Sequence, residues 1–141
     1  MAEKYSPSIL VDVVHKGLTP PNCDVTLQIS ATYAEGGVAK GIWKVGDPFI
    51  NGIGVAMGGF VASAADIMMA YAISSVLTED QTFASIDLHT TFHKPVFVGE
   101  VEVEAKVERV GRKLAYVKAE LFQNSKKVAD VVSSIMIMNK E

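Results

Sequence analysis

The chain contains one stretch in which an acid, a glycine pair and an amide have the types and spacing of a hydrolytic site. Asp66 is the single carboxylate in the otherwise apolar or small stretch from Asn51 to Leu77. An ionised side chain in that setting is costly to desolvate unless another group pairs with it or uses it in chemistry. Asp66 is therefore a candidate to activate water. The structural alternative is a buried acid held by hydrogen bonds, with Ser63 as a donor.

Gly58 and Gly59 stand at the start of the long helix that this stretch predicts. Glycines there leave backbone N–H groups open to close approach by a ligand, and the helix dipole favours negative charge at the same point. Such donors can form an oxyanion hole, to which Asn51 would add a neutral side-chain donor. The alternative is that the glycines only permit tight helix packing and that Asn51 is a turn residue.

The acid and the glycine pair are too far apart to serve one reaction within one chain. Asp66 follows Gly58 by eight residues, which is about 12 Å along a helix axis. Water activated at Asp66 cannot reach a carbonyl bound at the N-terminus of the same helix. If both groups serve one reaction, they come from different subunits. Two identical sites then lie at a two-fold interface.

The elements that position these groups follow from periodicity and turn residues. We expect a short amphipathic helix at about 8–15, a break at 19–22 and a long helix from Gly58 to about Leu77. Val25, Leu27 and Ile29 alternate with polar residues and predict a strand from Asp24. The other expected strands are 38–45, after a turn at 35–37, and 83–93, 101–110, 114–122 and 128–138.

These elements predict a single α+β domain over residues 1–141. A curved antiparallel sheet can wrap the long helix and bury most of its circumference, which would explain why that helix is apolar nearly all round. The last strand is apolar or small on both faces. One face can pack on the helix, and a second subunit is the simplest cover for the other, so we expect an oligomer.

Composition excludes several classes of function. The chain has 141 residues, 49% of them hydrophobic, and a net charge of −3 with scattered basic residues, which gives no footprint for nucleic acid. The start lacks the pattern of a secretory signal, and the one cysteine, Cys23, cannot form an internal disulfide, so we expect a cytoplasmic protein. The apolar helix is long enough to suggest a membrane span, but the central Asp66 disfavours that interpretation.

Three other motifs fail on geometry. A dinucleotide loop would need glycine at the position of Met57, so no nicotinamide or flavin site is indicated. His89 and His93 lie about 13 Å apart in an extended strand, too far to share a metal ion, and are better explained as surface or interface groups. No nucleophile-elbow motif GxSxG occurs. We therefore expect neither a metal nor a redox cofactor.

The surviving motif resembles that of the hotdog-fold acyl-CoA thioesterases of the phenylacetate-degradation type. Their pattern is an Asn, a Gly-containing loop, His-Gly-Gly, an Asp in the helix, a Ser-hydrophobic-Asp strand and an aromatic-x-basic-Pro turn. Here it reads NGIGVAMGG with Asp66 in the helix, then SID from Ser85 and FHKP from Phe92. The match covers residues 38 to 138 approximately.

The resemblance implies a long central helix wrapped by a curved antiparallel sheet, and hydrolysis of acyl-CoA thioesters to acid and coenzyme A. It implies a homodimer, and beyond it a dimer of dimers, with the thioester in a slot between two subunits. Asn51 and the Gly58 amide would polarise its carbonyl. Asp66 of the other subunit would act as general base or nucleophile, helped by Ser85.

Met57 departs from the family pattern, which has histidine there. A thioether cannot replace imidazole as a hydrogen-bond donor, and losing one such donor can lower the rate by orders of magnitude. This departure keeps open a non-catalytic acyl-CoA binding protein. A weaker alternative is an enoyl-thioester hydratase, which usually needs a His paired with an acid.

Further residues are candidates for binding the substrate. The helix start would contact it through Met57 and Gly59, and an apolar, adaptable acyl pocket would use Phe60, Met68 and Met69. The candidates for the phosphates of coenzyme A are the basic residues Lys94, Arg109, Arg112 and Lys113.

Overall fold

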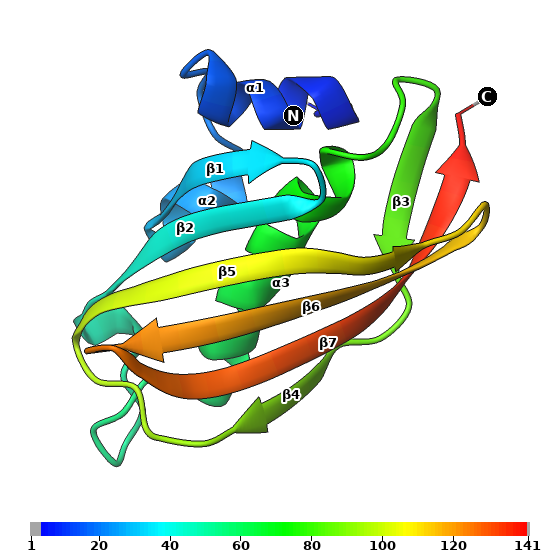
Figure 1. The fold of residues 1–141 in the computed structure, drawn as a ribbon. Helices are drawn as coiled ribbons and strands as arrows, with labels where there is room; N and C mark the ends of the chain where they lie inside the picture. Colours follow the sequence, from blue (N-terminus) through cyan, green and yellow to red (C-terminus); the bar gives the residue numbers. More distant parts are fainter. Residues whose placement is uncertain (1–3, 141) are drawn as a thin grey trace.

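The computed structural model describes residues 4–140 and has three α-helices and seven strands. The helices are α1 (Pro7–His15), α2 (Asn22–Leu27) and α3 (Gly58–Ser74), with a 3-10 turn at Asp47–Phe49. The strands are β1 (Ile29–Glu35), β2 (Val38–Val45), β3 (Gln81–Ser85), β4 (His89–Phe92), β5 (Gly99–Val110), β6 (Leu114–Gln123) and β7 (Lys126–Asn139). Figure 1 shows α3 lying against one face of a curved sheet, with α1 and α2 near the β1 edge.

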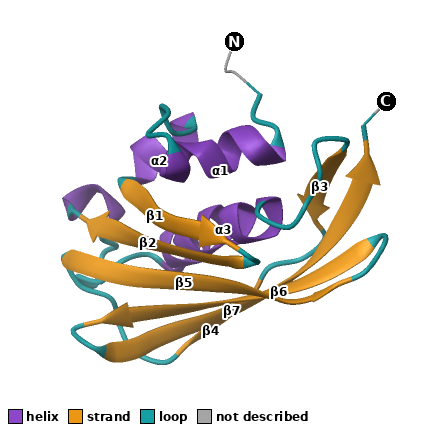
Figure 2. Cartoon of the chain, turned by 45° about the horizontal axis from the view of Figure 1, so that its top comes forward, coloured by secondary structure: helices purple, strands orange, loops and turns teal. Residues whose placement is uncertain are grey.

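All the strand pairs are antiparallel, in the order β1-β2-β5-β6-β7-β3, and β4 also pairs with β7. Along β5, β6 and β7 the buried residues alternate with less buried ones, so one face of each strand packs on the core. The view in Figure 2 shows the sheet curving around α3. This is the helix-in-sheet α+β architecture that the resemblance implies.

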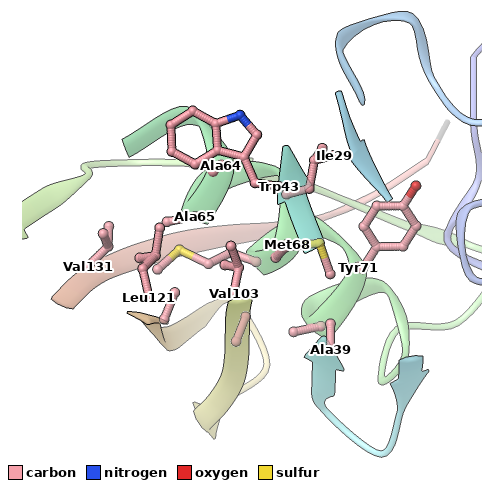
Figure 3. Close-up of a cluster of buried hydrophobic side chains, with 14 of the residues drawn as sticks. Ile29, Ala39, Trp43, Ala64, Ala65, Met68, Tyr71, Val103, Leu121 and Val131 are labelled. Carbon is pink, nitrogen blue, oxygen red and sulfur yellow. The ribbon is translucent and has the colours of Figure 1, made fainter. Parts of the chain in front are cut away.

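The core lies between α3 and the concave face of the sheet. Figure 3 shows Ala64 and Met68 of the helix among side chains from the strands, including Val103 and Leu121, and all four are at most 1% exposed. Small residues on the helix let it approach the sheet closely. At Gly41 of β2 an added Cβ would lie 2.7 Å from the Met68 sulfur, so this position accepts no side chain without repacking.

The helix α3 is less enclosed than its sequence predicts. Gly59 and Asp66 are exposed and Ser63 and Ala70 are half-buried, which gives the helix one open stripe at a spacing of three or four residues. The sequence predicts burial on most of the circumference, which the structure shows, but it does not predict this open face. Among residues 4–140, no helix combines the length and the apolar character needed to cross a membrane.

The segment from Asp24 is the clearest error of the sequence prediction. It forms the helix α2 instead of the start of a strand, and β1 begins only at Ile29. Asp24 and Leu27, three residues apart, are buried together, whereas Val25 is 60% exposed. The Tyr71 hydroxyl of α3 donates to the Asp24 carboxylate at 2.5 Å, a contact between distant parts of the chain that periodicity cannot reveal.

The predicted strand 83–93 is divided into β3 and β4 by Ile86–Leu88. Asp87 explains the interruption, because its carboxylate accepts the N–H of Ser134 at 2.8 Å and its carbonyl accepts the buried Ser133 hydroxyl at 2.7 Å. A side chain thus replaces part of the backbone ladder to β7. The interruption lies at the free edge of the sheet.

The remaining boundaries agree closely with the predictions. The strand 38–45 is confirmed as β2, and the glycine turn before it has positive φ at Gly36 and Gly37, which glycine adopts readily. The predicted N-terminal helix is confirmed as α1. The long helix ends at Ser74 instead of Leu77, because the Ser75 hydroxyl donates to the Ala72 carbonyl and accepts the Gly37 N–H, tying the chain to the β1–β2 turn.

Candidate active site

The N-terminus of α3 presents two free backbone donors. The helix begins at Gly58 after Met57, whose side chain makes no capping hydrogen bond. The Met57 carbonyl accepts from Phe60 and Val61, while the N–H groups of Gly58 and Gly59 donate to no described residue. Two adjacent unpaired N–H groups at the positive end of a helix form a binding site for an oxygen that carries negative charge.

Asn51 stands beside these donors at the start of the preceding loop. Its side-chain oxygen accepts the N–H groups of Ile53 and Val55, at 3.0 and 3.3 Å, and so fixes the loop. This is the turn role that the structural alternative assigned to it. The oxygen is thereby occupied, whereas the side-chain NH2 group donates to no residue within 4–140 and remains available to a ligand.

Asn51 and Gly58 line one hollow of about 470 Å³. Its other lining residues are Val55, Ala56, Val61, Phe92, His93, Lys94, Pro95 and Val96. The Phe92 ring lies against Gly58, since a Cβ added there would come within 2.8 Å of it. The hollow is therefore mainly apolar, with donors at one end, as a site for an apolar acyl group requires.

Asp66 lies in the middle of α3, on its open stripe. Burial among protein atoms raises the pKa of this carboxyl above its ordinary value of 3.8, and an interaction with the Ser85 hydroxyl partly offsets that rise. Ser63 does not cap the acid, because its hydroxyl donates instead to the Gly59 carbonyl at 2.8 Å. Asp66 is thus an exposed acid next to Ser85 and not a structural group sealed in the core.

The acid and the donors are separate within one chain. Neither Asp66 nor Ser85 lines the hollow that contains Asn51 and Gly58. The helix runs unbroken from Gly58 to Asp66, so the separation of about 12 Å along its axis applies to the folded protein. In a single copy, the backbone donors therefore lie at the start of α3 and the acid lies in its middle, at two separate places.

The other helix-start residues have different surroundings. Met57 is 45% exposed, and its terminal methyl lies 3.2 Å from where a Cβ on Gly59 would stand, so its side chain lies against Gly59. Phe60 is half-buried and packs on Phe49 with ring centroids 5.0 Å apart. Met68 and Met69 are buried in the packed core.

The four basic candidates separate into two places. Arg109, Arg112 and Lys113 line a second hollow, of about 700 Å³, on the outer side of the sheet. Lys94 lies instead beside Gly58 in the first hollow. Clustering of three cations from the end of β5 and the following turn was not evident from sequence spacing alone.

Two structural roles were missed by the sequence analysis. Phe92 covers Gly58, and although the aromatic residue of FHKP was noted, its sequence gives no sign of which face it occupies. His93, next in the chain, turns to the outer side, where its Nε2 lies 2.7 Å from the Asp130 carboxylate. Within 4–140 no three His, Cys, Asp or Glu side chains are grouped as a metal site would require.

Comparison with solved structures agrees with this fold. The PaaI protein of the Escherichia coli phenylacetic acid degradation operon superimposes with a TM-score of 0.75 at 25% identity, covering 81% of this chain and 86% of its own. A phenylacetic acid degradation-related protein from Ralstonia eutropha gives a TM-score of 0.83 at 24% identity, over 90% and 98%. A hypothetical thioesterase from Streptococcus pneumoniae with coenzyme A gives 0.74 at 13%, over 80% and 88%.

A search of curated protein sequences finds no match. The family model described as the thioesterase superfamily matches residues 53–129, more than half of the 141 residues, and the match includes all of α3 with both its glycines and Asp66. The chain therefore belongs to the thioesterase superfamily and has the hotdog fold that its motif predicts.

Proposed function

We propose that the protein hydrolyses acyl-CoA thioesters to a free acid and coenzyme A. The observation that carries this proposal is the unpaired N–H group of Gly58, which lines an apolar hollow together with the free Asn51 amide, while the next N–H group, that of Gly59, is also unpaired. These donors suit the oxyanion that forms when a thioester carbonyl is attacked. The thioesterase family of the chain and the neighbour with coenzyme A support the same reaction class.

The proposed site needs two copies of the chain. The broken edge at β3 and β4 leaves Ile86, Leu88 and Phe92 exposed, at 53%, 38% and 54%, beside the open stripe of α3. A free sheet edge with exposed apolar side chains is a surface that another chain can cover. We propose that a two-fold homodimer joins here, so that each Asp66 faces the other copy's Gly58.

In this dimer the chemistry divides between the subunits. The Gly58 N–H and the Asn51 amide of one copy donate to the thioester carbonyl oxygen. Asp66 of the other copy removes a proton from water, whose oxygen bonds to the carbonyl carbon, or attacks that carbon itself before water releases the acid. The C–S bond breaks and coenzyme A leaves as the thiol after taking a proton. Ser85 orients the carboxylate and supports its charged form.

The second hollow supplies a place for the charged end of the substrate. Arg109, Arg112 and Lys113 form no ion pair within residues 4–140, and Tyr116 lies beside them. Unpaired cations next to an aromatic ring suit a phosphorylated nucleotide. We propose that these three residues take the phosphates, whereas Lys94 lies close to the reacting end. We place the reaction in the cytoplasm, where the free Cys23 thiol is compatible with reducing conditions.

One observation supports a second candidate function, binding of acyl-CoA without hydrolysis. The Met57 side chain lies against Gly59 at the helix start but offers no hydrogen-bond donor to the leaving group. The slot for the substrate would then be intact while the chemistry is slow or absent.

The two functions separate in a thiol-release assay over a panel of short, medium and aromatic acyl-CoAs. We expect release of coenzyme A thiol, and loss of at least a hundredfold in kcat in Asp66→Ala with unchanged circular dichroism, as removal of a catalytic acid or base typically causes. Ser63→Ala on the same helix is the control and should retain activity. Unchanged turnover in Asp66→Ala would remove that residue from the reaction, and tight calorimetric binding without hydrolysis would establish the second function.

A further inference from the structure

The side chain of Phe92 points at Gly58 with the far edge of its ring. The ring atoms Cζ, Cε1 and Cε2 would lie 2.8, 3.3 and 3.4 Å from a Cβ built on Gly58. Such a Cβ stands about 1.5 Å from the Gly58 Cα, so the ring edge contacts the residue whose N–H is the proposed donor. Phe92 is nonetheless 54% exposed, so much of the ring is open to a molecule that enters the hollow.

The backbone that carries this ring is tied to the sheet. Phe92 is the last residue of β4, which pairs with β7. The N–H groups of His93 and Lys94 both donate to the Val128 carbonyl, at 2.8 and 3.2 Å. On the outer side, the His93 Nε2 lies 2.7 Å from the Asp130 carboxylate. The end of β4 is therefore anchored through both its backbone and a side chain.

The start of α3 is joined to the same segment of chain. The N–H of Ala56, two residues before Gly58, donates to the Val96 carbonyl at 2.8 Å, and these two residues are 6% and 3% exposed. The ring and the helix start are thus linked through buried backbone on both sides. Only rotation of the Phe92 side chain is left to change their spacing.

A second stiff side chain bounds the space next to the Gly58 N–H. Val61 follows Gly58 by three residues, so it lies on the same side of α3. It lines the same hollow as Phe92 and is 1% exposed. Its β-branched side chain has few rotamers available in a helix. The space beside the donor is therefore narrow, whereas the hollow as a whole holds about 470 Å³.

We propose that Phe92 selects acyl groups that carry no branch on the carbon next to the thioester carbonyl. The inference rests on the proposed function, which places the carbonyl oxygen at the Gly58 N–H, and its new content is the substrate class. An oxygen that accepts this N–H lies about 2.9 Å from the nitrogen. The carbonyl carbon is about 1.2 Å further and the α-carbon about 1.5 Å beyond it. Substituents on the α-carbon are thus the first part of the acyl group to meet the ring.

The position of a branch decides whether the acyl group fits. An unbranched α-carbon carries only hydrogen atoms beside the chain and can pass the edge of Phe92. A methyl group on that carbon needs the space that the ring edge occupies, and packed side chains yield such space only at a cost. A methyl group one carbon further lies in the wider part of the hollow. Selection therefore depends on where the branch is and not on total bulk or hydrophobicity.

Three isomeric substrates test this selection. Pentanoyl-CoA, isovaleryl-CoA and α-methylbutyryl-CoA have the same composition and differ only in the position of the branch. Thiol release gives kcat/KM for each. We expect α-methylbutyryl-CoA to fall about tenfold or more below pentanoyl-CoA, the usual range for one misplaced methyl group. Isovaleryl-CoA, which is branched one carbon further, should stay within about threefold of pentanoyl-CoA.

Shortening the side chain should remove the discrimination in steps. Phe92→Leu should narrow the ratio of kcat/KM values, and Phe92→Ala should bring the three isomers within about threefold of one another. Phe92→Tyr keeps the ring and should keep the native ratio. Leu88→Ala is the matched control, because Leu88 is 38% exposed on the same sheet edge but does not line the hollow. It should keep the native ratio, and sedimentation velocity compares the oligomeric state of every variant with that of the native chain.

Native protein that cleaves all three isomers within threefold of one another would overturn the selection, as would an equal loss on all three in Phe92→Ala. Relaxed selection in Leu88→Ala would show that the ring acts through the subunit contact instead. If no isomer releases thiol, hydrolysis is refuted, and calorimetric dissociation constants of the same three isomers then carry the comparison. Native protein that neither cleaves nor binds any isomer would refute the proposed site together with the selection.

Discussion

Met57 is the residue at which this chain departs most clearly from the motif it otherwise follows. Its side chain lies against Gly59 at the helix start, and sulfur there can donate no hydrogen bond. Installing Met57→His should restore a donor beside the reacting group and raise kcat by about tenfold or more, since single donors of this kind are worth about a hundredfold or more when removed.

Met57→Leu is the matched control for that change, because it keeps an apolar side chain of similar volume without adding a donor. Steady-state thiol release measures both variants. If histidine and leucine give the same kcat, position 57 does not contact the reacting group, and the departure at Met57 has no catalytic meaning.

Asp66 and Ser85 make a prediction about pH. Burial raises the pKa of the Asp66 carboxyl above 3.8 and the Ser85 interaction lowers it again in part. Since the ionised form is the active one, kcat/KM falls as pH decreases through this raised pKa. Ser85→Ala removes the lowering contribution, so its acid limb should move to higher pH than that of the native protein.

The pH profile of kcat/KM measured by thiol release checks this shift. Ser63→Ala, which removes a hydroxyl from the helix that carries Asp66, is the control. A general loss of rate with an unmoved acid limb would mean that Ser85 acts on the substrate and not through Asp66. An acid limb that moves to lower pH would contradict the account.

At the scale of the elements, α2 is fixed by a contact with α3 that lies almost fifty residues away in sequence. Tyr71 donates to the buried Asp24 carboxylate, and Asp24 is only 2% exposed. Tyr71→Phe leaves that acceptor without its donor and should lower the free energy of unfolding by about 1–3 kcal/mol, the usual penalty for an unsatisfied buried group. Urea denaturation followed by circular dichroism measures the change.

Tyr33→Phe is the control, since the Tyr33 hydroxyl makes no hydrogen bond within residues 4–140 and the side chain is 41% exposed. It should leave the free energy of unfolding nearly unchanged. Equal stabilities of the two variants would show that the Tyr71–Asp24 bond does not hold α2 in place.

The elements also show what the sequence could predict. Alternation over β2 and β5 to β7, and the glycine turn at Gly36 and Gly37, gave strands close to the observed bounds, because local pattern and burial agree there. The segment at Asp24 misled because its apolar residues alternate as in a strand, whereas the residues that are buried, Asp24 and Leu27, lie three apart on one face of a helix. The interruption of β3 and β4 depends on Asp87 bonding to Ser133 and Ser134, which no local pattern contains.

For the candidate site, too, local sequence predicted some features, and others depended on contacts between distant parts of the chain. Asn51 and Gly58 were predictable together because they are close in sequence, and the structure brings these two residues into one hollow. The contact of Phe92 with Gly58 depends on which face of a short edge strand Phe92 occupies. The grouping of Arg109 with Arg112 and Lys113 depends on the path of the β5–β6 turn. The sequence left open whether Asp66 was a functional acid or a buried structural one, and the structure places it on the open stripe of α3.

At the scale of the whole molecule, one chain holds the donors and the acid apart, and the proposed reaction needs a second copy to unite them. The central claim is therefore that Asn51 and Gly58 of one subunit act with Asp66 of the other. Two inactive variants, Asn51→Ala and Asp66→Ala, can test this when they are combined in one dimer. Neither residue lies in the core, but Asn51→Ala also removes the oxygen that holds the loop, so circular dichroism of each variant checks its fold first.

Complementation between these variants is the most direct measurement. The two chains are co-expressed with different affinity tags, the heterodimer is purified over both tags, and its thiol release is compared with that of each homodimer. If the site is shared, one of the two sites regains both native groups, and the heterodimer should show about half of the native kcat. If both groups act within one chain, every site keeps a defect, and a heterodimer as inactive as its parents would contradict the account.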